Sequence, residues 1–183
     1  MQGWIISIFS LKFRGTLGSI YSGMITGLLL VTSMAAFADQ AEKTALPVAP
    51  DWQLTTQQGK PVALSDYRGK PLILHFWATW CPYCKRVQPG LDALYQQYQS
   101  QGLQAVAISF REDDDATPGE VLANRGITFP TAVNGEQVAA NYGVRGTPTT
   151  FLIDTAGRVV YATNTSDPND EALRNAVKTL VNP

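Results

Sequence analysis

Two cysteines lie three positions apart in the sequence, directly after a short apolar segment. Cys81 and Cys84 are the only cysteines among 183 residues, and residues 72–77 before them are apolar apart from one histidine, which is typical of a buried strand. Pro82 suits the first turn of a helix, because the N–H that proline lacks would have no partner there. Cys81 is therefore expected at a helix N-terminus, where free N–H groups and the helix dipole stabilise a thiolate. Cys84, one turn later on the same face, can form a disulfide with it.

A structural, metal-binding or haem-binding role for the cysteine pair fits the sequence less well than redox chemistry. A structural disulfide that closes so short a loop would contribute only about 2 kcal/mol in the loop-entropy model. A zinc site needs four ligands, and the chain offers no further cysteine and a single histidine. Haem attachment needs a histidine after the second cysteine, where Lys85 stands. The pair therefore predicts redox chemistry, with no bound metal and no cofactor.

The residues around this pair resemble the thioredoxin superfamily. Residues 80–85 read Trp-Cys-Pro-Tyr-Cys-Lys, Pro89 follows inside the next helix, and residues 146–149 read Gly-Thr-Pro-Thr. Within the superfamily the chain is most similar to the exported thiol–disulfide oxidoreductases of the TlpA/ResA/CcmG type, over roughly residues 50–181. The resemblance implies an α/β, thioredoxin-like fold: a mixed central sheet with helices on both faces and an N-terminal β-hairpin extension. It also implies an enzyme that exchanges disulfides with protein cysteines.

The resemblance assigns roles to the residues of the motifs. Cys81 would attack the partner and Cys84 would break the resulting mixed disulfide. The Thr147–Pro148 bond would be cis and would lie against the cysteines, with the backbone of Thr147 pairing with an extended substrate. The surface expected to contact partner peptides comprises Trp80, Pro82, Tyr83, Thr147 and Pro148. Packing of the Trp80 ring against the protein is the alternative role for that side chain.

His75 is the only histidine and lies six residues before Cys81. In thioredoxins this position holds a buried aspartate that takes part in proton transfer at the second cysteine, and strand alternation puts His75 on the helix-packing face. A neutral imidazole there would accept the Cys84 proton, whereas an imidazolium would stabilise a thiolate and favour oxidation. A buried, hydrogen-bonded histidine without a chemical role is an equal alternative.

Two departures from known families bear on function. Relatives of the TlpA/ResA/CcmG type commonly carry a buried glutamate three residues after the second cysteine, where this chain has Val87. A role in cytochrome c maturation therefore does not follow from the resemblance. Thiol peroxidases share the fold, but they place threonine or serine three residues before the reactive cysteine, where this chain has Ala78.

Periodicity predicts the elements that position these residues. A helix over residues 82–101 carries its apolar side chains along one face, Pro89 should kink it, and Gly102 should end it. Strands are expected at residues 52–55, 62–64, 72–77, 103–110, 149–153 and 159–162, an extended piece at 129–131, and further helices at 117–125, 134–142 and from 167 onward. This order predicts a mixed sheet, with residues 52–64 as a small hairpin whose first strand is an edge strand.

Some polar residues have expected structural roles. Thr117, Asn134 and Asp167 are each expected at the start of a helix, the first as part of a capping box with Glu120. The acidic run at residues 112–115 is interpreted as a solvated loop.

The N-terminus predicts export. Lys12 and Arg14 precede an uncharged stretch that ends in Ala-Phe-Ala, which is the pattern of a secretory signal peptide. The stretch is also near membrane-spanning length, so an uncleaved anchor is the alternative. The expected organisation is a signal peptide over residues 1–38, a linker over 39–49 and a thioredoxin-like domain over 50–183. The expected compartment is a bacterial periplasm, which is oxidising. There the ratio of disulfide to dithiol in the pair would depend on the reduction potential of the pair.

Charge and compartment limit the partners. Removing residues 1–38, which contain Lys12 and Arg14 and no acidic residue, changes the formal charge from −1 to −3, so nucleic acid is not an expected partner. The expected partners are exported proteins that contain cysteines and a membrane protein that donates electrons. The protein itself is expected to be a monomer, with membrane contact only through an N-terminal anchor.

The leading hypothesis is therefore a periplasmic thiol–disulfide oxidoreductase that acts as a reductant. An oxidant or isomerase of exported proteins is a near alternative, which the reduction potential distinguishes. A redox-silent chaperone that holds Cu(I) between two thiolates, or assists assembly, is an alternative of a different class.

Overall fold

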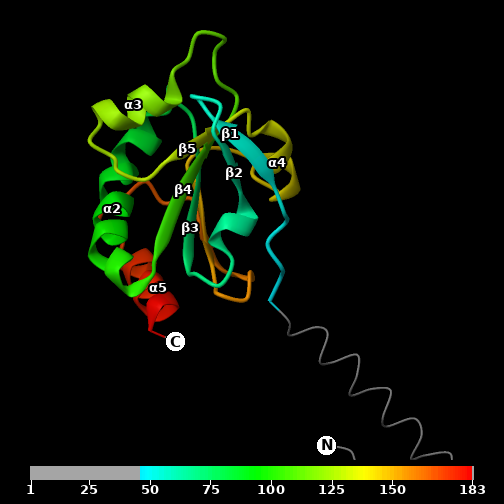
Figure 1. The fold of residues 1–183 in the computed structure, drawn as a ribbon. Coiled ribbons are helices and arrows are strands. Elements are labelled where there is room, and N and C mark those ends of the chain that lie inside the picture. The colour runs from blue at the N-terminus through cyan, green and yellow to red at the C-terminus, as the bar shows by residue number, and fades with distance from the viewer. Residues whose placement is uncertain (1–45, 183) are drawn as a thin grey trace, which may run out of the picture. The chain divides into compact units, whose positions relative to one another are not determined.

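A mixed β-sheet forms the centre of the protein. The computed structural model describes residues 46–182, and within this range seven strands form one sheet in the order β2-β1-β5-β4-β3-β6-β7 (Figure 1). The strands are β1 (Gln53–Thr56), β2 (Pro61–Ala63), β3 (Leu72–Trp77), β4 (Gln104–Ser109), β5 (Thr131–Val133), β6 (Thr149–Ile153) and β7 (Val159–Thr163). The helices are α2 (Pro82–Tyr98), α3 (Pro118–Asn124), α4 (Glu136–Asn141) and α5 (Glu171–Val181), with short 3-10 turns η1 (Leu64–Tyr67) and η2 (Gln99–Gln101).

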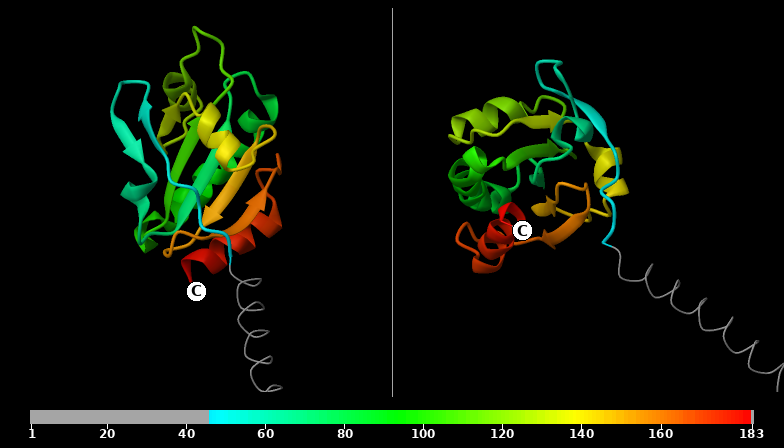
Figure 2. Two further views of the ribbon diagram at one scale, coloured as in Figure 1. Left: turned by 90° about the vertical axis from the view of Figure 1, so that its right-hand side faces the viewer. Right: turned by 60° about the horizontal axis from the view of Figure 1, so that its bottom comes forward.

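Both faces of the sheet are covered by helices. Alternate residues of β3 point to opposite faces, so Ile73 and Trp77 pack with α2, α3 and α5, whereas Leu74 and Phe76 pack with η1 and α4. Figure 2 shows α4 on one side of the sheet and α2 and α5 on the other. The predicted α/β fold, with a mixed sheet between two helical layers, is confirmed.

Strand β3 is the centre of this arrangement and leads directly to the cysteines. It pairs in parallel with β4 and antiparallel with β6, and all six of its residues are buried. Burial on both faces explains why its sequence, apart from His75, is continuously apolar rather than alternating. Helix α2 begins five residues after β3 and ends, as predicted, before Gly102, whose φ of 96° is left-handed.

The N-terminal hairpin is present, but the prediction that its first strand lies at an edge was wrong. Strand β1 pairs antiparallel with β2 on one side and with β5 on the other, so β2 is the edge strand. The contact with β5 is short, joining Thr55 to Val133 and Thr56 to Ala132. It joins segments almost 80 residues apart, and no local pattern in either segment indicates it.

One predicted helix start is confirmed without its cap bond, and two are wrong. Helix α3 begins at Pro118 after Thr117, as predicted, but Thr117 makes no side-chain cap bond, so the predicted capping box is not formed. Asn134 adopts a left-handed φ of 59° and α4 begins two residues later, at Glu136. Helix α5 begins after Asp170, whose side chain accepts the Leu173 N–H at 2.7 Å. A turn in which the Asp167 carboxylate accepts the Asn169 N–H delays its start.

The folded domain begins before residue 50. The Ala49 N–H donates to the Gly157 carbonyl at 2.9 Å and the Val159 N–H donates to the Pro47 carbonyl at 2.8 Å, so residues 47–49 lie along the β6–β7 turn. The predicted signal peptide and the rest of the linker lie outside the described residues. Between residues 46 and 182, none of the helices has the length and apolar character needed to cross a membrane.

Candidate active site

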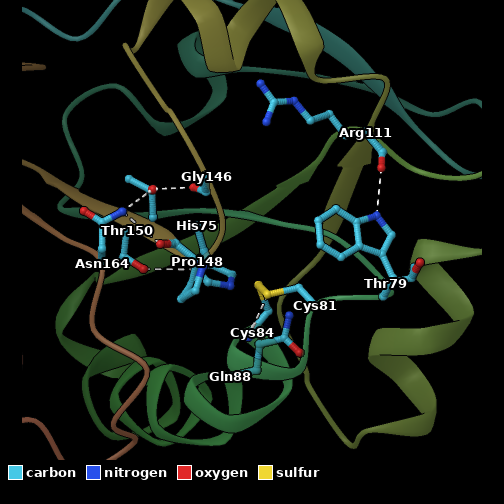
Figure 3. The surroundings of a disulfide bond; sticks show 12 residues. His75, Thr79, Cys81, Cys84, Gln88, Arg111, Gly146, Pro148, Thr150 and Asn164 are labelled. Atoms are coloured by element: carbon cyan, nitrogen blue, oxygen red, sulfur yellow. Dashed lines mark hydrogen bonds between the residues drawn. A yellow bond between two sulfur atoms is a disulfide. The ribbon is translucent and has the colours of Figure 1, made fainter.

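The two cysteines meet at the N-terminus of α2 and are joined by a disulfide, with their Cα atoms 5.3 Å apart (Figure 3). Cys81 is the N-cap residue, and its sulfur accepts the backbone N–H of Cys84 at 3.1 Å. Cys81 is 3% exposed and Cys84 is fully buried. A thiolate from a partner therefore reaches the Cys81 sulfur before that of Cys84.

The surroundings of the Cys81 sulfur favour negative charge. The free N–H groups at the start of α2 point toward it, and the first turn of this helix contains no acidic residue. Lys85 and Arg86 are exposed on the same turn, and the Arg86 guanidinium lies 5.4 Å from the centre of the Tyr83 ring. The helix terminus, rather than the cationic side chain of Lys85 or Arg86, is thus the main source of stabilisation for a thiolate at this position.

The predicted cis bond between Thr147 and Pro148 is confirmed. Figure 3 shows the Pro148 ring beside the disulfide. Asn164 holds this loop, because its amide Nδ2 donates to the Pro148 carbonyl at 3.0 Å and to Thr149 Oγ1 at 2.7 Å. Asn164 follows β7 in an unremarkable polar segment and was not among the predicted site residues.

An open pocket of about 340 Å³ adjoins the cis proline. Its lining residues are Tyr83, Gly146, Thr147, Pro148, Asn164 and Ser166. Tyr83 is 53% exposed and Trp80 is 55% exposed, so two aromatic side chains flank the cysteines at the surface. The Trp80 indole N–H donates to the Arg111 carbonyl at 2.8 Å, which fixes the ring while leaving much of it accessible.

His75 is fully buried on β3, on the same face of the sheet as the disulfide. Its Nδ1 lies 3.0 Å from Thr150 Oγ1, whereas its Nε2 has no hydrogen-bond partner among residues 46–182. Burial lowers the pKa of His75 to about 3, so the imidazole is neutral at neutral pH. Figure 3 shows the ring behind Pro148 and beside the cysteines. Of the two predicted states of this residue, the neutral imidazole is the one that burial supports.

Two charged side chains hold the segment before Cys81. The Glu112 carboxylate accepts the Thr79 N–H at 3.0 Å and the Thr79 hydroxyl at 2.6 Å. On the other side, the Arg125 guanidinium donates to the Thr79 carbonyl at 3.0 Å. Glu112 is therefore an exception to the predicted solvated loop at residues 112–115. Its partner is 33 positions away, and nothing in the local sequence indicates the contact.

Val87 is buried in the apolar cluster that also contains both cysteines. This position therefore supplies no carboxylate to the disulfide. The part of the chain that the structure describes has no group of three or more His, Cys, Asp or Glu residues placed to hold a metal ion. Figure 3 shows the polar side chains of His75 and Gln88 near the disulfide, and each has a nitrogen without a hydrogen-bond partner among residues 46–182.

Known proteins share both the sequence and the fold of this chain. Residues 47–162 match the AhpC/TSA family. The thiol-disulfide oxidoreductase ResA of Bacillus thuringiensis is 36% identical over 151 residues, which are 82% of this chain and 85% of that protein. ResA of Geobacillus thermodenitrificans is 44% identical over 123 residues, which are 64% of this chain and 70% of that protein. A crystal structure from Chlorobium tepidum, described as a thiol:disulfide interchange protein DsbE, superposes with a TM-score of 0.67. It is 34% identical and covers 74% of this chain and 96% of that one.

The matched residues 47–162 include both cysteines and the cis proline. A cysteine pair that forms a disulfide at a helix N-terminus, on a thioredoxin-like fold, is suited to thiol–disulfide exchange. The chain therefore acts as a thiol–disulfide oxidoreductase and belongs to the AhpC/TSA family, with a thioredoxin-like fold.

Proposed function

We propose that this protein is a monomeric periplasmic reductant, which receives electrons from a membrane protein and reduces disulfides in exported proteins. The observation that carries the proposal is the Cys81–Cys84 pair at the start of α2, next to a neutral buried His75. The basic and then uncharged N-terminal sequence that ends in Ala-Phe-Ala supports export.

In the first step the Cys81 thiolate attacks one sulfur of a client disulfide. A bond forms between Cys81 and that sulfur, the client disulfide breaks, and the second client sulfur leaves as a thiolate. Trp80, Pro82 and Tyr83 would contact the client chain at this stage. The backbone of Thr147, beside Pro148, would pair with an extended client segment.

In the second step Cys84 releases the client. As the Cys84 sulfur attacks the Cys81 sulfur, its proton passes through Nε2 of His75 to the client sulfur that leaves, so that no lasting imidazolium forms. The Cys81–Cys84 disulfide forms, the mixed disulfide breaks, and the client sulfur leaves as a thiolate that takes up this proton. Two electrons have then passed from the cysteine pair to the client.

The neutral state of His75 supports a reductant over an oxidant. An imidazolium beside the cysteines would stabilise the thiolate form and make the disulfide strongly oxidising. Burial lowers the pKa of His75 to about 3, so no such charge is present at neutral pH. A redox titration tests the direction: a potential in the range of thioredoxin supports the proposal, and one near that of strong oxidants contradicts it.

Trapping with Cys84→Ser tests the exchange and identifies the client. The variant should form a stable mixed disulfide through Cys81 with an exported protein, whereas the Cys81→Ser control should form none. Insulin reduction in the presence of dithiothreitol provides a rate, and equal turnover by the wild type and Cys81→Ser would contradict the proposal.

A further inference from the structure

Gln88 is a fully buried polar residue in α2, one helical turn after Cys84. Residues four apart lie on the same face of a helix, and long side chains lean back toward the helix N-terminus. The side chain of Gln88 therefore extends toward the sulfur of Cys84. Figure 3 shows the amide group of Gln88 directly beside the disulfide.

The orientation of this amide is fixed by Arg125. The Arg125 Nη1 donates to Gln88 Oε1 at 2.8 Å, and the same guanidinium donates to the Thr79 carbonyl at 3.0 Å and lies 5.4 Å from the Trp77 ring centre. A flipped amide would turn its NH₂ group toward a guanidinium, which has only donors. The amide oxygen thus faces Arg125, and Figure 3 shows the amide nitrogen on the side of the sulfurs.

The amide nitrogen of Gln88 has no acceptor in the disulfide form. Its Nε2 is buried and without a hydrogen-bond partner among the residues that the structure describes. Buried donors are nearly always paired, and an unpaired donor destabilises the state that contains it. A sulfur in a disulfide is a weak acceptor, whereas a thiolate is a strong one. Opening the disulfide would therefore supply the acceptor that this donor lacks.

We propose that Gln88 is a catalytic hydrogen-bond donor to the Cys84 sulfur, which it stabilises when the disulfide opens. The inference rests on the redox cycle proposed above. When a thiolate of the electron donor attacks Cys81, a bond forms to the Cys81 sulfur and the Cys81–Cys84 bond breaks. The electron pair of that bond goes to Cys84, whose thiolate accepts the Gln88 N–H. Cys81 uses the Cys84 backbone N–H instead, so each sulfur has a donor of its own.

The main test is the redox equilibrium of Gln88→Met with glutathione. Methionine keeps the length and volume of the side chain but has no N–H. The equilibrium should shift about tenfold toward the disulfide, which is about 30 mV for a two-electron couple. Gln97→Met, the same substitution on the exposed side of α2, is the matched control and should leave the equilibrium unchanged.

Two further measurements separate this role from a structural one. In the Cys81→Ser background, where Cys84 is the only thiol, Gln88→Met should raise the thiol pKa by about one unit, followed by the ultraviolet absorbance of the thiolate. In thermal unfolding, Gln88→Met should lower the Tm of both forms, because the Arg125 guanidinium loses an acceptor in each, but it should lower the Tm of the reduced form more. A merely structural role would lower the two by the same amount.

Gln88→Glu is a second variant in case the methionine protein does not fold. Its carboxylate can still pair with Arg125, but it offers no N–H and repels a thiolate, so the shift toward the disulfide should be larger. Equilibria within twofold of the wild type for every folded variant would overturn the role of Gln88. A wild type that does not cycle between disulfide and dithiol would instead overturn the proposed function.

Discussion

The Nδ1 atom of His75 lies 3.0 Å from the Oγ1 atom of Thr150, the residue directly opposite it in the β3–β6 pair. This contact fixes one nitrogen of the ring and leaves Nε2 buried and unpaired within the described range. A ring held in this way is oriented before any proton moves. The same pairing links the central strand to the strand that follows the cis proline.

Replacing His75 by phenylalanine should slow the release of a client from Cys81. The ring volume is kept but the base is lost, and general-base catalysis typically contributes about 10²-fold or more. Stopped-flow measurement of mixed-disulfide resolution reports this step directly. Thr150→Val is the matched control, which removes the partner of Nδ1 but keeps the base and should slow resolution far less. Unchanged resolution in His75→Phe would show that the histidine is structural.

Burial of His75 should also make folding depend on pH. The imidazole has a pKa of 6.5 when unperturbed and of about 3 in the folded protein, so the unfolded state binds more protons between these values. The stabilisation is complete above pH 6.5, and the free energy of unfolding decreases as the pH falls toward 3, by up to about 1.4 kcal/mol per pH unit.

Urea unfolding of the wild type and of His75→Phe at several pH values tests this dependence. The chain has one histidine, so the difference between the two proteins isolates its contribution from that of the carboxylates. Parallel curves between pH 3 and 6.5 would contradict the prediction.

Glu112→Ala should destabilise the segment that precedes the cysteines. The Thr79 N–H and hydroxyl would both lose their acceptor, and a buried donor left without one costs about 1–3 kcal/mol. Urea unfolding measures the loss, and insulin reduction should decrease with it because Thr79 positions Cys81. Asp114→Ala, at an exposed position of the same loop, should change neither quantity. Equal stability of the two variants would show that Glu112 is solvated after all.

Trp80→Ala should impair exchange with proteins more than exchange with small disulfides. An exposed aromatic anchor at a docking surface is commonly worth about 1–2 kcal/mol, so insulin reduction should fall about tenfold. Reaction with a small aromatic disulfide, which needs only Cys81, should stay near the wild-type rate. Val160→Ala removes an exposed apolar side chain from β7 and serves as the control. A parallel loss toward both substrates would indicate that Trp80 supports the cysteines rather than the client.

Gly90→Ala should destabilise the contact between α2 and the segment before α5. A Cβ atom at this position would overlap the backbone of Pro168. Alanine normally stabilises a helix interior by about 1 kcal/mol over glycine. Overpacking costs about 1–3 kcal/mol, and the backbone of Pro168 cannot avoid the overlap by a change of rotamer. A net loss is therefore expected in urea unfolding. Gly146→Ala, which meets no atom within 4 Å, should be close to neutral. A stabilised Gly90→Ala protein would mean that the segment around Pro168 moves away from α2 at little cost in free energy.

Features that depend on residues close together in the chain were predictable. A proline after Cys81 marks the start of α2, the apolar run of residues 72–77 marks a strand buried on both faces, and Gly102 ends the helix. The disulfide follows from a spacing of one helical turn. The cis proline was predicted from the resemblance rather than from physics, since no local energy requires that isomer.

Contacts between segments that are far apart in the sequence could not be predicted from it. Strand β5 has three residues and could be recognised only by its partners β1 and β4. Glu112 and Gln88 are polar residues of the kind usually found at surfaces, yet each bonds to a residue more than 30 positions away. Asn164 likewise reaches the cis-proline loop from the far end of β7.

The sequence by itself determined which atoms carry the chemistry, because a thiol pair at a helix N-terminus depends only on neighbouring residues. The tertiary structure decided how those atoms are tuned. Burial keeps His75 neutral, and the crossing of β3, α2 and α3 brings Arg125 to Gln88. Burial and hydrogen-bond partners are properties of the packed sheet and helices, and a pattern of residue types along one chain does not contain them.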